Sequence, residues 1–236
     1  MHGELIKSTK EFLNILNEKK KQMEDDKEIY AEVDELNHLH ITSFQPFGRK
    51  YMFPCPENIT GLDASKLTLP NVTDYSLLFS NYEKIESLIL SKLDTHEAIL
   101  MRFMFYDCKN LKELDLSTFN TSKVKDMYAM FCSCKSLESL NIKPFDFSNV
   151  ENIESMFLGC EKLRNLSFGK NLKESINLTE SPLNHGSVMS VIKGLAKVEK
   201  QQTLWISEES YNTLSKDEIK LAKKKNWLIN TIAINQ

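Results

Sequence analysis

Glycine is scarce in this chain, with seven residues among 236, and none of the seven belongs to a phosphate-binding motif. No apolar run approaches the ~18 residues that a membrane-spanning helix requires. The first seven residues carry no apolar segment of the kind that a signal peptide contains. These absences argue against a nucleotide-binding loop and a membrane span, and they predict a cytoplasmic protein. The alternative is a cell-surface protein whose signal peptide has been removed.

The chain also lacks a strong charge of either sign, since its formal net charge is -3. A nucleic-acid-binding protein usually shows a basic balance or a basic face. The two dense lysine runs, at 19–21 and 223–225, have acidic residues nearby, and we interpret each run as the solvated face of a helix. The sequence therefore predicts no nucleic-acid partner.

Cysteine is present in an odd number, five. Three of the cysteines recur at a regular interval beside methionine and phenylalanine: Cys108, Cys134 and Cys160. Free cysteine is among the most buried residue types, and we expect the distance between stacked units to exceed the ~7 Å limit for a disulfide. The prediction is three reduced, buried thiols, which suits a cytosolic setting.

Residues that carry catalysis or bind metals do not cluster in the sequence. His38 and His40 would lie on one face of a strand as a possible metal pair, but no further ligands stand at metal spacing, so we interpret them as ordinary histidines. Cys132 and Cys134 could form a redox pair, yet the repeat places Cys134 in the core. We expect no metal, no cofactor and no enzymatic activity.

The chain does contain a repeat of 26 residues. Five leucines keep this interval: Leu62, Leu88, Leu114, Leu140 and Leu166. Methionine–phenylalanine pairs keep it too, at 104–105, 130–131 and 156–157. A fixed period in the range of about 20–50 residues indicates stacked supersecondary units that bury their apolar faces against one another.

Each unit contains two patterns that call for different backbones. Leu114 and Leu116 alternate, so they predict a short strand with one buried face. After a polar turn, Asp126 can cap a short helix whose apolar residues follow at i, i+3, i+4 and i+7: Met127, Met130, Phe131 and Cys134. Because the helix returns the chain each time, successive strands are predicted to pair in parallel.

The stretch 101–124 reads M-R-F-M-F-Y-D-C-K-N-L-K-E-L-D-L-S-T-F-N-T-S-K-V. It resembles the BspA-like leucine-rich repeat of bacterial surface proteins, and the resemblance covers about residues 57–230. The match weakens toward both ends, where Tyr82 replaces a cysteine and Asn171 replaces a phenylalanine. The resemblance implies an α/β fold: a leucine-rich-repeat solenoid with a parallel β-sheet on its inner face, short helices outside and a cap at each end.

Three regions follow from this interpretation. Residues 1–56 are predicted to form an N-terminal helical cap and an irregular lead-in, residues 57–180 the solenoid, and residues 181–236 a C-terminal α/β cap. A helix near 9–24 either covers the first coil or serves as a partner-binding arm, and a strand is expected at 28–33. In the C-terminal cap we expect a helix from about 188 to 195, a strand at 203–206, a helix at 217–225 and a strand at 227–229.

The inner sheet face is the usual recognition surface of this architecture, and strand alternation selects its residues. The candidate partner-binding residues on it are Asp63, Ile89, Glu113, Asp115, Asn141 and Lys143. Small polar residues also let a curved sheet close without crowding, and that alternative stays open. Trp205, between Leu204 and Ile206, is predicted to point outward on the same face as the best binding anchor. Packing against the cap is its other interpretation.

The composition, the repeat and the resemblance together favour a non-catalytic protein-binding module. One interpretation is an intracellular bacterial or phage-encoded protein that docks on a partner protein and blocks or scaffolds it. A second is a fragment of a bacterial surface adhesin, which the resemblance alone implies. An enzyme on a repeat scaffold is the least favoured. Each of these functions is inferred from the fold, and the fold does not identify the partner.

Overall fold

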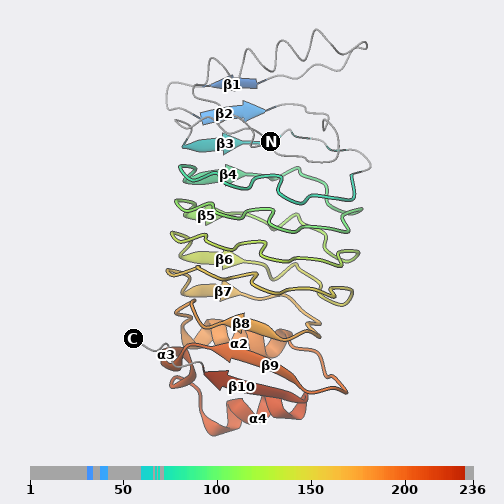
Figure 1. Ribbon diagram of the computed structural model, residues 1–236, viewed down its shortest axis with the longest axis vertical. Helices are drawn as coiled ribbons and strands as arrows, with labels where there is room; N and C mark the ends of the chain where they lie inside the picture. Colours follow the sequence, from blue (N-terminus) through green and yellow to red (C-terminus); the bar gives the residue numbers. More distant parts are fainter. Residues whose placement is uncertain are drawn as a thin grey trace, which may run out of the picture.

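The computed structural model describes the backbone of residues 31–33, 38–41, 60–65, 67, 69 and 72–231, and the side chains of those from 60 onward. The chain forms a mixed α/β structure with mostly parallel strands in small open sheets and few helices. Figure 1 shows successive turns of the chain stacked one below another, with the helices gathered at the C-terminal end. The helix predicted near 9–24 lies outside the described residues.

Seven strands lie along the stack: β1 (Ala31–Val33), β2 (His38–Ile41), β3 (Gly61–Asp63), β4 (Ser87–Ile89), β5 (Glu113–Leu114), β6 (Ser139–Asn141) and β7 (Asn165–Ser167). β1 pairs with β2 in the antiparallel direction, and β2 to β5 then pair in parallel within one sheet. β6 and β7 form a second parallel sheet, and a single bridge between Asp115 and Asn141 joins the two. Part of the strand predicted at 28–33 therefore exists as β1.

The strand register follows the 26-residue interval. Leu62 pairs with Leu88, Leu88 pairs with Leu114, and Leu140 pairs with Leu166. These five leucines are 2 to 7% exposed, and their neighbours along β4 to β7 are exposed. The predicted parallel pairing and alternation are confirmed, because each coil places the same side chain over that of the coil before it.

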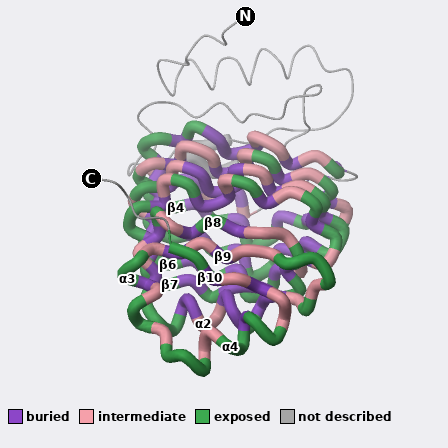
Figure 2. Tube along the Cα trace, turned by 60° about the horizontal axis from the view of Figure 1, so that its bottom comes forward, coloured by how far each residue is buried: buried purple, intermediate pink, exposed green. Residues whose placement is uncertain are grey.

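The core between the two sides of the stack also repeats by coil, and Figure 2 shows it as buried segments inside each turn. Rings stack in a column with centroid distances of 5.8, 5.5 and 5.6 Å: Phe79, Phe105, Phe131 and Phe157. Beside this column the thiol of Cys134 donates to the carbonyl oxygen of Phe105 at 3.2 Å, and Cys160 does the same to Phe131. Cys108, Cys134 and Cys160 are all buried, as the repeat predicts, and Cys134 and Cys160 form no disulfide with a described residue.

Four runs of the chain lie where the outer helices were predicted, and together they are named the turn ladder: 74–81, 100–107, 126–133 and 152–159. The helix prediction is wrong for these runs. Each contains two residues with positive φ, such as Ala129 at 51° and Ser133 at 64°. A residue in the left-handed region cannot continue a right-handed helix. Asp126 still caps its run, since its Oδ1 accepts the N–H of Tyr128 at 2.9 Å, but a turn follows.

Hydrogen bonds between coils replace the helical ones in the turn ladder. The N–H of Ala129 donates to the carbonyl of Glu154 at 2.9 Å, and the N–H of Phe131 donates to that of Met156 at 3.0 Å. The alternate N–H groups close turns within a run, as Cys132 does onto Ala129 at 3.1 Å. The same pattern links each of the first three runs to the next, and the donors that link one run to another point toward the C-terminal end of the stack.

The C-terminal end of the stack is built from a small parallel sheet and three helices: β8 (Ile176–Leu178), α2 (His185–Gly194), β9 (Gln202–Ile206), α3 (Glu208–Tyr211), α4 (Lys216–Lys224) and β10 (Trp227–Thr231). The sheet order is β10-β9-β8. The predicted helix near 188–195, the strand at 203–206, the helix at 217–225 and the strand at 227–229 are all present, with shifted bounds. Ser215 and Glu218 form a capping box that begins α4.

Candidate functional site

The last run of the turn ladder, residues 152–159, has no further run below it. Three N–H groups occupy the positions from which earlier runs donate to the next coil, and no acceptor for them exists in the described part of the chain: those of Ile153, Ser155 and Phe157. The side chains of Ile153 and Phe157 are 3% and 1% exposed. Because an unpaired backbone N–H near the core is costly, this edge of the ladder is an open set of donors.

The fourth donor of this run is satisfied within the chain. The N–H of Gly159 donates to a carboxylate oxygen of Glu180 at 2.7 Å. Gly159 has a φ of 75°, and a Cβ there would lie 3.2 Å from the Cα of Ser133. Glycine therefore allows the left-handed backbone and the close approach to the previous coil, and Glu180 closes one end of the row.

The lower edge of β7, the last strand of the stack, is covered by helix α2, whereas the lower edge of the ladder is open. Below β7, Ser187 of α2 accepts the N–H of Leu166 through its Oγ at 2.8 Å, and Ser190 accepts the N–H of Phe168 at 2.8 Å. Helix α2 thus accepts one N–H of β7 and the N–H of the residue that follows the strand, through two serine side chains. The sequence supplies no equivalent cover for Ile153, Ser155 and Phe157.

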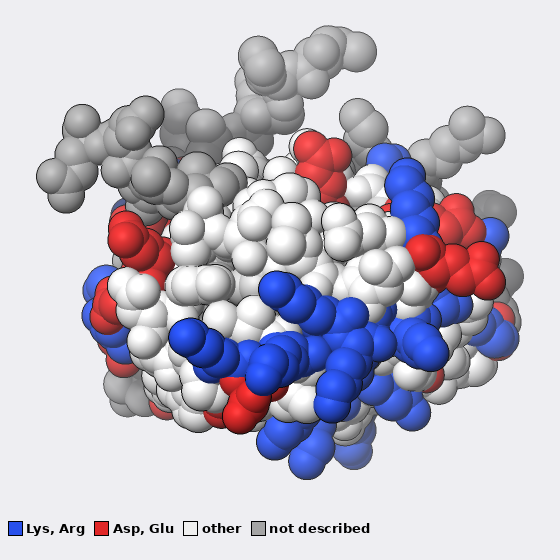
Figure 3. Space-filling view, turned by 90° about the horizontal axis from the view of Figure 1, so that it is seen from below, with Lys and Arg blue, Asp and Glu red and all other residues white. Residues whose placement is uncertain are grey.

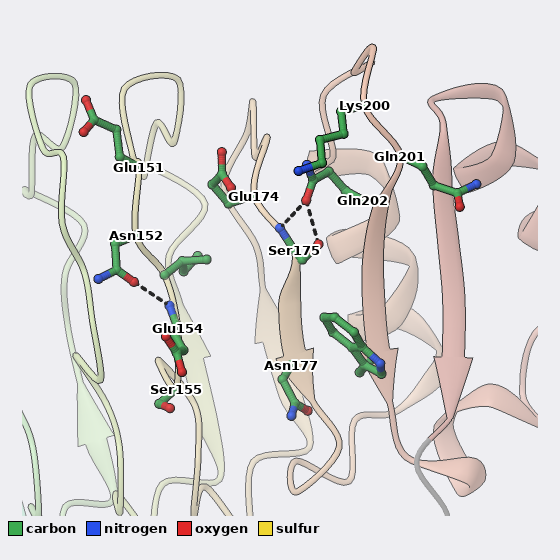
Figure 4. A pocket seen from close by; sticks show the side chains of 12 residues that line it. Glu151, Asn152, Glu154, Ser155, Glu174, Ser175, Asn177, Lys200, Gln201 and Gln202 are labelled. Carbon is green, nitrogen blue, oxygen red and sulfur yellow. Dashed lines mark hydrogen bonds between the residues drawn. The ribbon is translucent and has the colours of Figure 1, made fainter.

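A hollow of about 650 Å³ lies along the open edge of the ladder. It is lined by Glu151, by residues 152–155 of the ladder and by Glu174, Ser175, Asn177, Lys200, Gln201, Gln202 and Trp205. A second hollow of about 140 Å³ shares Glu154, Ser155 and Asn177 with it and extends to Phe157, Leu158, Thr179 and Glu180. We name the two together the end groove, and Figure 4 shows its ladder wall facing β8 and β9.

Hydrogen bonds hold the polar walls of the end groove in place. Gln202 accepts both the N–H of Ser175 at 3.0 Å and its hydroxyl at 2.6 Å, which ties β9 to the segment before β8 (Figure 4). On the ladder wall, Asn152 accepts the N–H of Glu154 at 3.1 Å. The groove is therefore bordered by bonded side chains, and the open backbone donors lie between them.

The charge around the end groove is mostly negative. Its lining contains four carboxylates and one ammonium group: Glu151, Glu154, Glu174 and Glu180, against Lys200. Glu151 lies 3.3 Å from Lys125 of the previous coil. Glu154 and Glu174 make no ion pair with any residue that the structure describes. The groove thus combines N–H donors in its floor with uncompensated carboxylates on its rim.

Trp205 lines the end groove and is half-buried there. The prediction that it shares a face with Glu113, Asp115 and Asn141 is wrong, because β8 and β9 lie next to the ladder, whereas α2 packs under β7. Alternation along β9 correctly places Leu204 and Ile206 inside. It does not show whether β9 lies on the strand side or on the ladder side of the stack. The indole is therefore separated from the other predicted binding residues.

Those other residues all lie on or beside the strands of the stack. Ile89, Glu113, Asp115, Asn141 and Lys143 are exposed, and Asp63 is half-buried. Three of them have a local role, because each accepts the backbone N–H of the second residue after it through its Oδ1. Asp63 accepts that of Ser65 at 2.8 Å, Asp115 that of Ser117 at 2.9 Å and Asn141 that of Lys143 at 3.1 Å. The bonds from Ser117 lower the pKa of Asp115. Because these side chains accept backbone N–H groups at or just after the strands, their polar character is explained in part without a partner protein.

Lysines are distributed differently along the stack and at its end. Within the stack they pair with glutamates one coil away, as Lys112 does with Glu86 at 2.7 Å and Lys135 with Glu161 at 2.8 Å. Figure 3 shows lysines gathered in a band at the C-terminal end. Within the run 223–225, Lys223 and Lys224 are exposed, as a solvated helix face predicts. Lys225 is not, since its Nζ donates to three carbonyls at the end of α2 and burial lowers its pKa.

Among the residues that the structure describes, no group of three or more histidine, cysteine, aspartate or glutamate side chains could hold a metal ion. None of the described helices has the length and apolar character needed to cross a membrane.

The amide donors and the acids of the end groove were not predicted from the sequence. Glu154 and Glu174 look like ordinary surface residues of two consecutive coils. One signal was available: the 26-residue pattern stops after Leu166, so the ladder had to end near the run that precedes it. A backbone edge at that point could have been inferred, although its partner could not.

Comparison with known proteins gives one family. A family described as "Mycoplasma protein of unknown function, DUF285" matches residues 49–170, which is just over half of the chain. No curated protein and no solved structure matches the chain.

Proposed function

Because this chain belongs to the DUF285 family, whose function is unknown, we propose from its structure that it is a non-catalytic protein-binding module. In this proposal the fold is a leucine-rich-repeat solenoid of the BspA type, and the partner docks at the end groove. The stacked coils supply a rigid frame, and the groove lies where their regular stacking stops.

One observation carries the proposal: the open donors of the ladder edge and a half-buried tryptophan line the same hollow. Tryptophan is enriched at binding hot spots, because a ring buried in an interface contributes a large contact area. Unpaired N–H groups in a groove favour a ligand that brings hydrogen-bond acceptors. A protein segment supplies both contacts, and an intracellular blocking or scaffolding protein and a surface adhesin could each use the groove.

The test compares the truncation of a side chain in the end groove with the truncation of an exposed apolar side chain on the strand side. The partner is first isolated from the native host by pull-down with mass spectrometry, and its affinity for Trp205→Ala is then measured by calorimetry. Loss of a hot-spot residue costs ~2 kcal/mol or more, so the affinity should fall at least about 30-fold. The control is Ile89→Ala, which removes a side chain that is 49% exposed on the strand side.

The control variant should bind with unchanged affinity. If Ile89→Ala weakens binding and Trp205→Ala does not, the partner docks on the strand face with Glu113 and Asp115, and the end groove is not the site. Trp205→Ala must also keep the unfolding midpoint of the parent, because a large loss of stability would place the indole in the cap instead.

A further inference from the structure

We propose that the end groove recognises a basic segment of the partner, which binds as an additional run of the turn ladder. Its backbone carbonyls would accept the N–H groups of Ile153, Ser155 and Phe157. This inference rests on the proposed function and specifies the chemistry of the partner. It goes further, because it makes the partner's backbone, and not only its side chains, part of the interface.

The ladder already binds backbone carbonyl oxygens of the kind that a partner segment would bring. In each of the three earlier runs the N–H groups at the same positions donate to carbonyl oxygens of the next coil, at 2.8 to 3.0 Å. The left-handed residues that aim these donors recur in the last run, at Ser155 and Gly159. The last run therefore presents a preformed donor edge, and little conformational entropy remains to be lost there when an acceptor arrives.

The number of open donors sets the length of the partner segment. Within the stack, donors on alternate residues meet carbonyls on alternate residues, such as those of Asn152, Glu154 and Met156. Three open donors therefore correspond to every second carbonyl in a partner segment of about five residues. The bond from Gly159 to Glu180 closes the row at one end, so the segment cannot extend past that point without displacing the carboxylate.

The charge on the rim of the end groove favours a basic segment over an acidic one. Backbone donors alone would also suit an anion, since rows of N–H groups often form anion-binding concavities. Here the rim carries four carboxylates against Lys200, and Glu154 and Glu174 make no ion pair with any described residue. Like charges on the rim would repel an acidic ligand, whereas Lys or Arg side chains of a peptide would neutralise these two groups. A cationic side chain can in addition stack on the face of Trp205.

The experiment uses a library of random dodecapeptides selected on the full chain. We expect the selected peptides to be enriched in Lys and Arg and to lose at least about 10-fold in affinity toward the double variant Glu154→Lys/Glu174→Lys. The matched control is Glu208→Lys/Glu209→Lys, which reverses two exposed acids on α3 outside the groove and should leave the affinity unchanged. Selection of acidic peptides would overturn the inference.

A second measurement separates ladder extension from simple occupation of the groove. Amide exchange followed by NMR with a selected peptide bound should slow at Ile153, Ser155 and Phe157 by at least about 100-fold, because exchange requires a free N–H. If Trp205→Ala weakens the peptide but these three amides still exchange rapidly, the groove binds protein and the ladder inference is wrong. If no peptide is selected, the ladder inference is also wrong, and the proposed function keeps its own test with the native partner.

Discussion

The backbone N–H of Gly159 and the carboxylate of Glu180 are joined at 2.7 Å, and this bond ends the turn ladder. In the three earlier runs the equivalent donor meets a carbonyl of the next coil; here it meets a side chain from the segment after β8. A carboxylate thus takes the place of the backbone carbonyl as acceptor, and the last run keeps its donor geometry without a following coil. It also explains why only three donors remain open.

Removal of the Glu180 carboxylate should open the fourth donor. In Glu180→Ala the Gly159 amide should exchange at least about 10-fold faster than in the parent protein, because its acceptor is gone. The measurement is amide exchange by NMR. In the control Glu161→Ala, which removes the exposed partner of Lys135, Gly159 should keep its rate. Equal rates in both variants would mean that Glu180 does not close the row in solution.

Leu114 should contribute strongly to stability, because it is 7% exposed and pairs in register with Leu88. Leu114→Ala should lower the free energy of unfolding by about 2–5 kcal/mol through loss of burial and formation of a cavity. Denaturant unfolding measures this. Ile89→Ala, on an exposed position of the adjacent strand, should change it by less than about 0.5 kcal/mol. A loss below about 1 kcal/mol for Leu114→Ala would contradict the assigned register.

The thiols of the core column should be inert in the folded protein. Cys108, Cys134 and Cys160 are 0 to 1% exposed, and burial raises the pKa of both Cys134 and Cys160 above the ordinary thiol range. Thiolate is the reactive form, so a thiol reagent should label these three only after denaturant is added. Rapid labelling of all three in the native protein would show that the column is open to solvent.

Tyr75 should make stability fall at high pH. Burial, and secondarily the nearby Asp94, raise its pKa from 10.0 to about 12, and its hydroxyl donates to the carbonyl of Asp94 at 2.6 Å. The folded state therefore holds this proton more tightly than the unfolded state does. That contribution is fully present below pH 10 and is lost as the pH rises toward 12. Comparison of unfolding free energies with Tyr75→Phe isolates it, and a constant difference across that window would contradict the assignment.

The 26-residue interval was sufficient to predict which strands pair and in which register. Leu88 and Leu114 occupy the same position in consecutive units, and burial of one apolar face leaves only one register that keeps both inside. The C-terminal elements were also predictable, because α2 and β9 carry ordinary helix and strand patterns with clear ends. These features depend on local sequence patterns and on the burial of apolar side chains, and both can be inferred from the sequence of one chain.

The turn ladder was not predicted, since its apolar spacing is the same as that of a helix. Met127, Met130, Phe131 and Cys134 point inward from either backbone. The distinguishing feature is the pair of left-handed residues in each run, and the second position of the pair is occupied by Asn81, Asp107, Ser133 and Gly159. Asn, Asp and Gly favour that region, so this column was a usable signal. The open edge itself follows from three-dimensional stacking, which no local pattern encodes.

The account depends most directly on the amide exchange rates of Ile153, Ser155 and Phe157 in the free protein. Their matched controls are Met127, Ala129 and Phe131, which stand one coil earlier, at the same positions, and donate to the next run at 2.9 to 3.0 Å. The account predicts that the first three exchange at least about 100-fold faster than the second three, although Ile153 and Phe157 have buried side chains. Equal, slow exchange in both sets would mean that the edge of the ladder is already satisfied, and both the proposed site and the mode of binding would be contradicted.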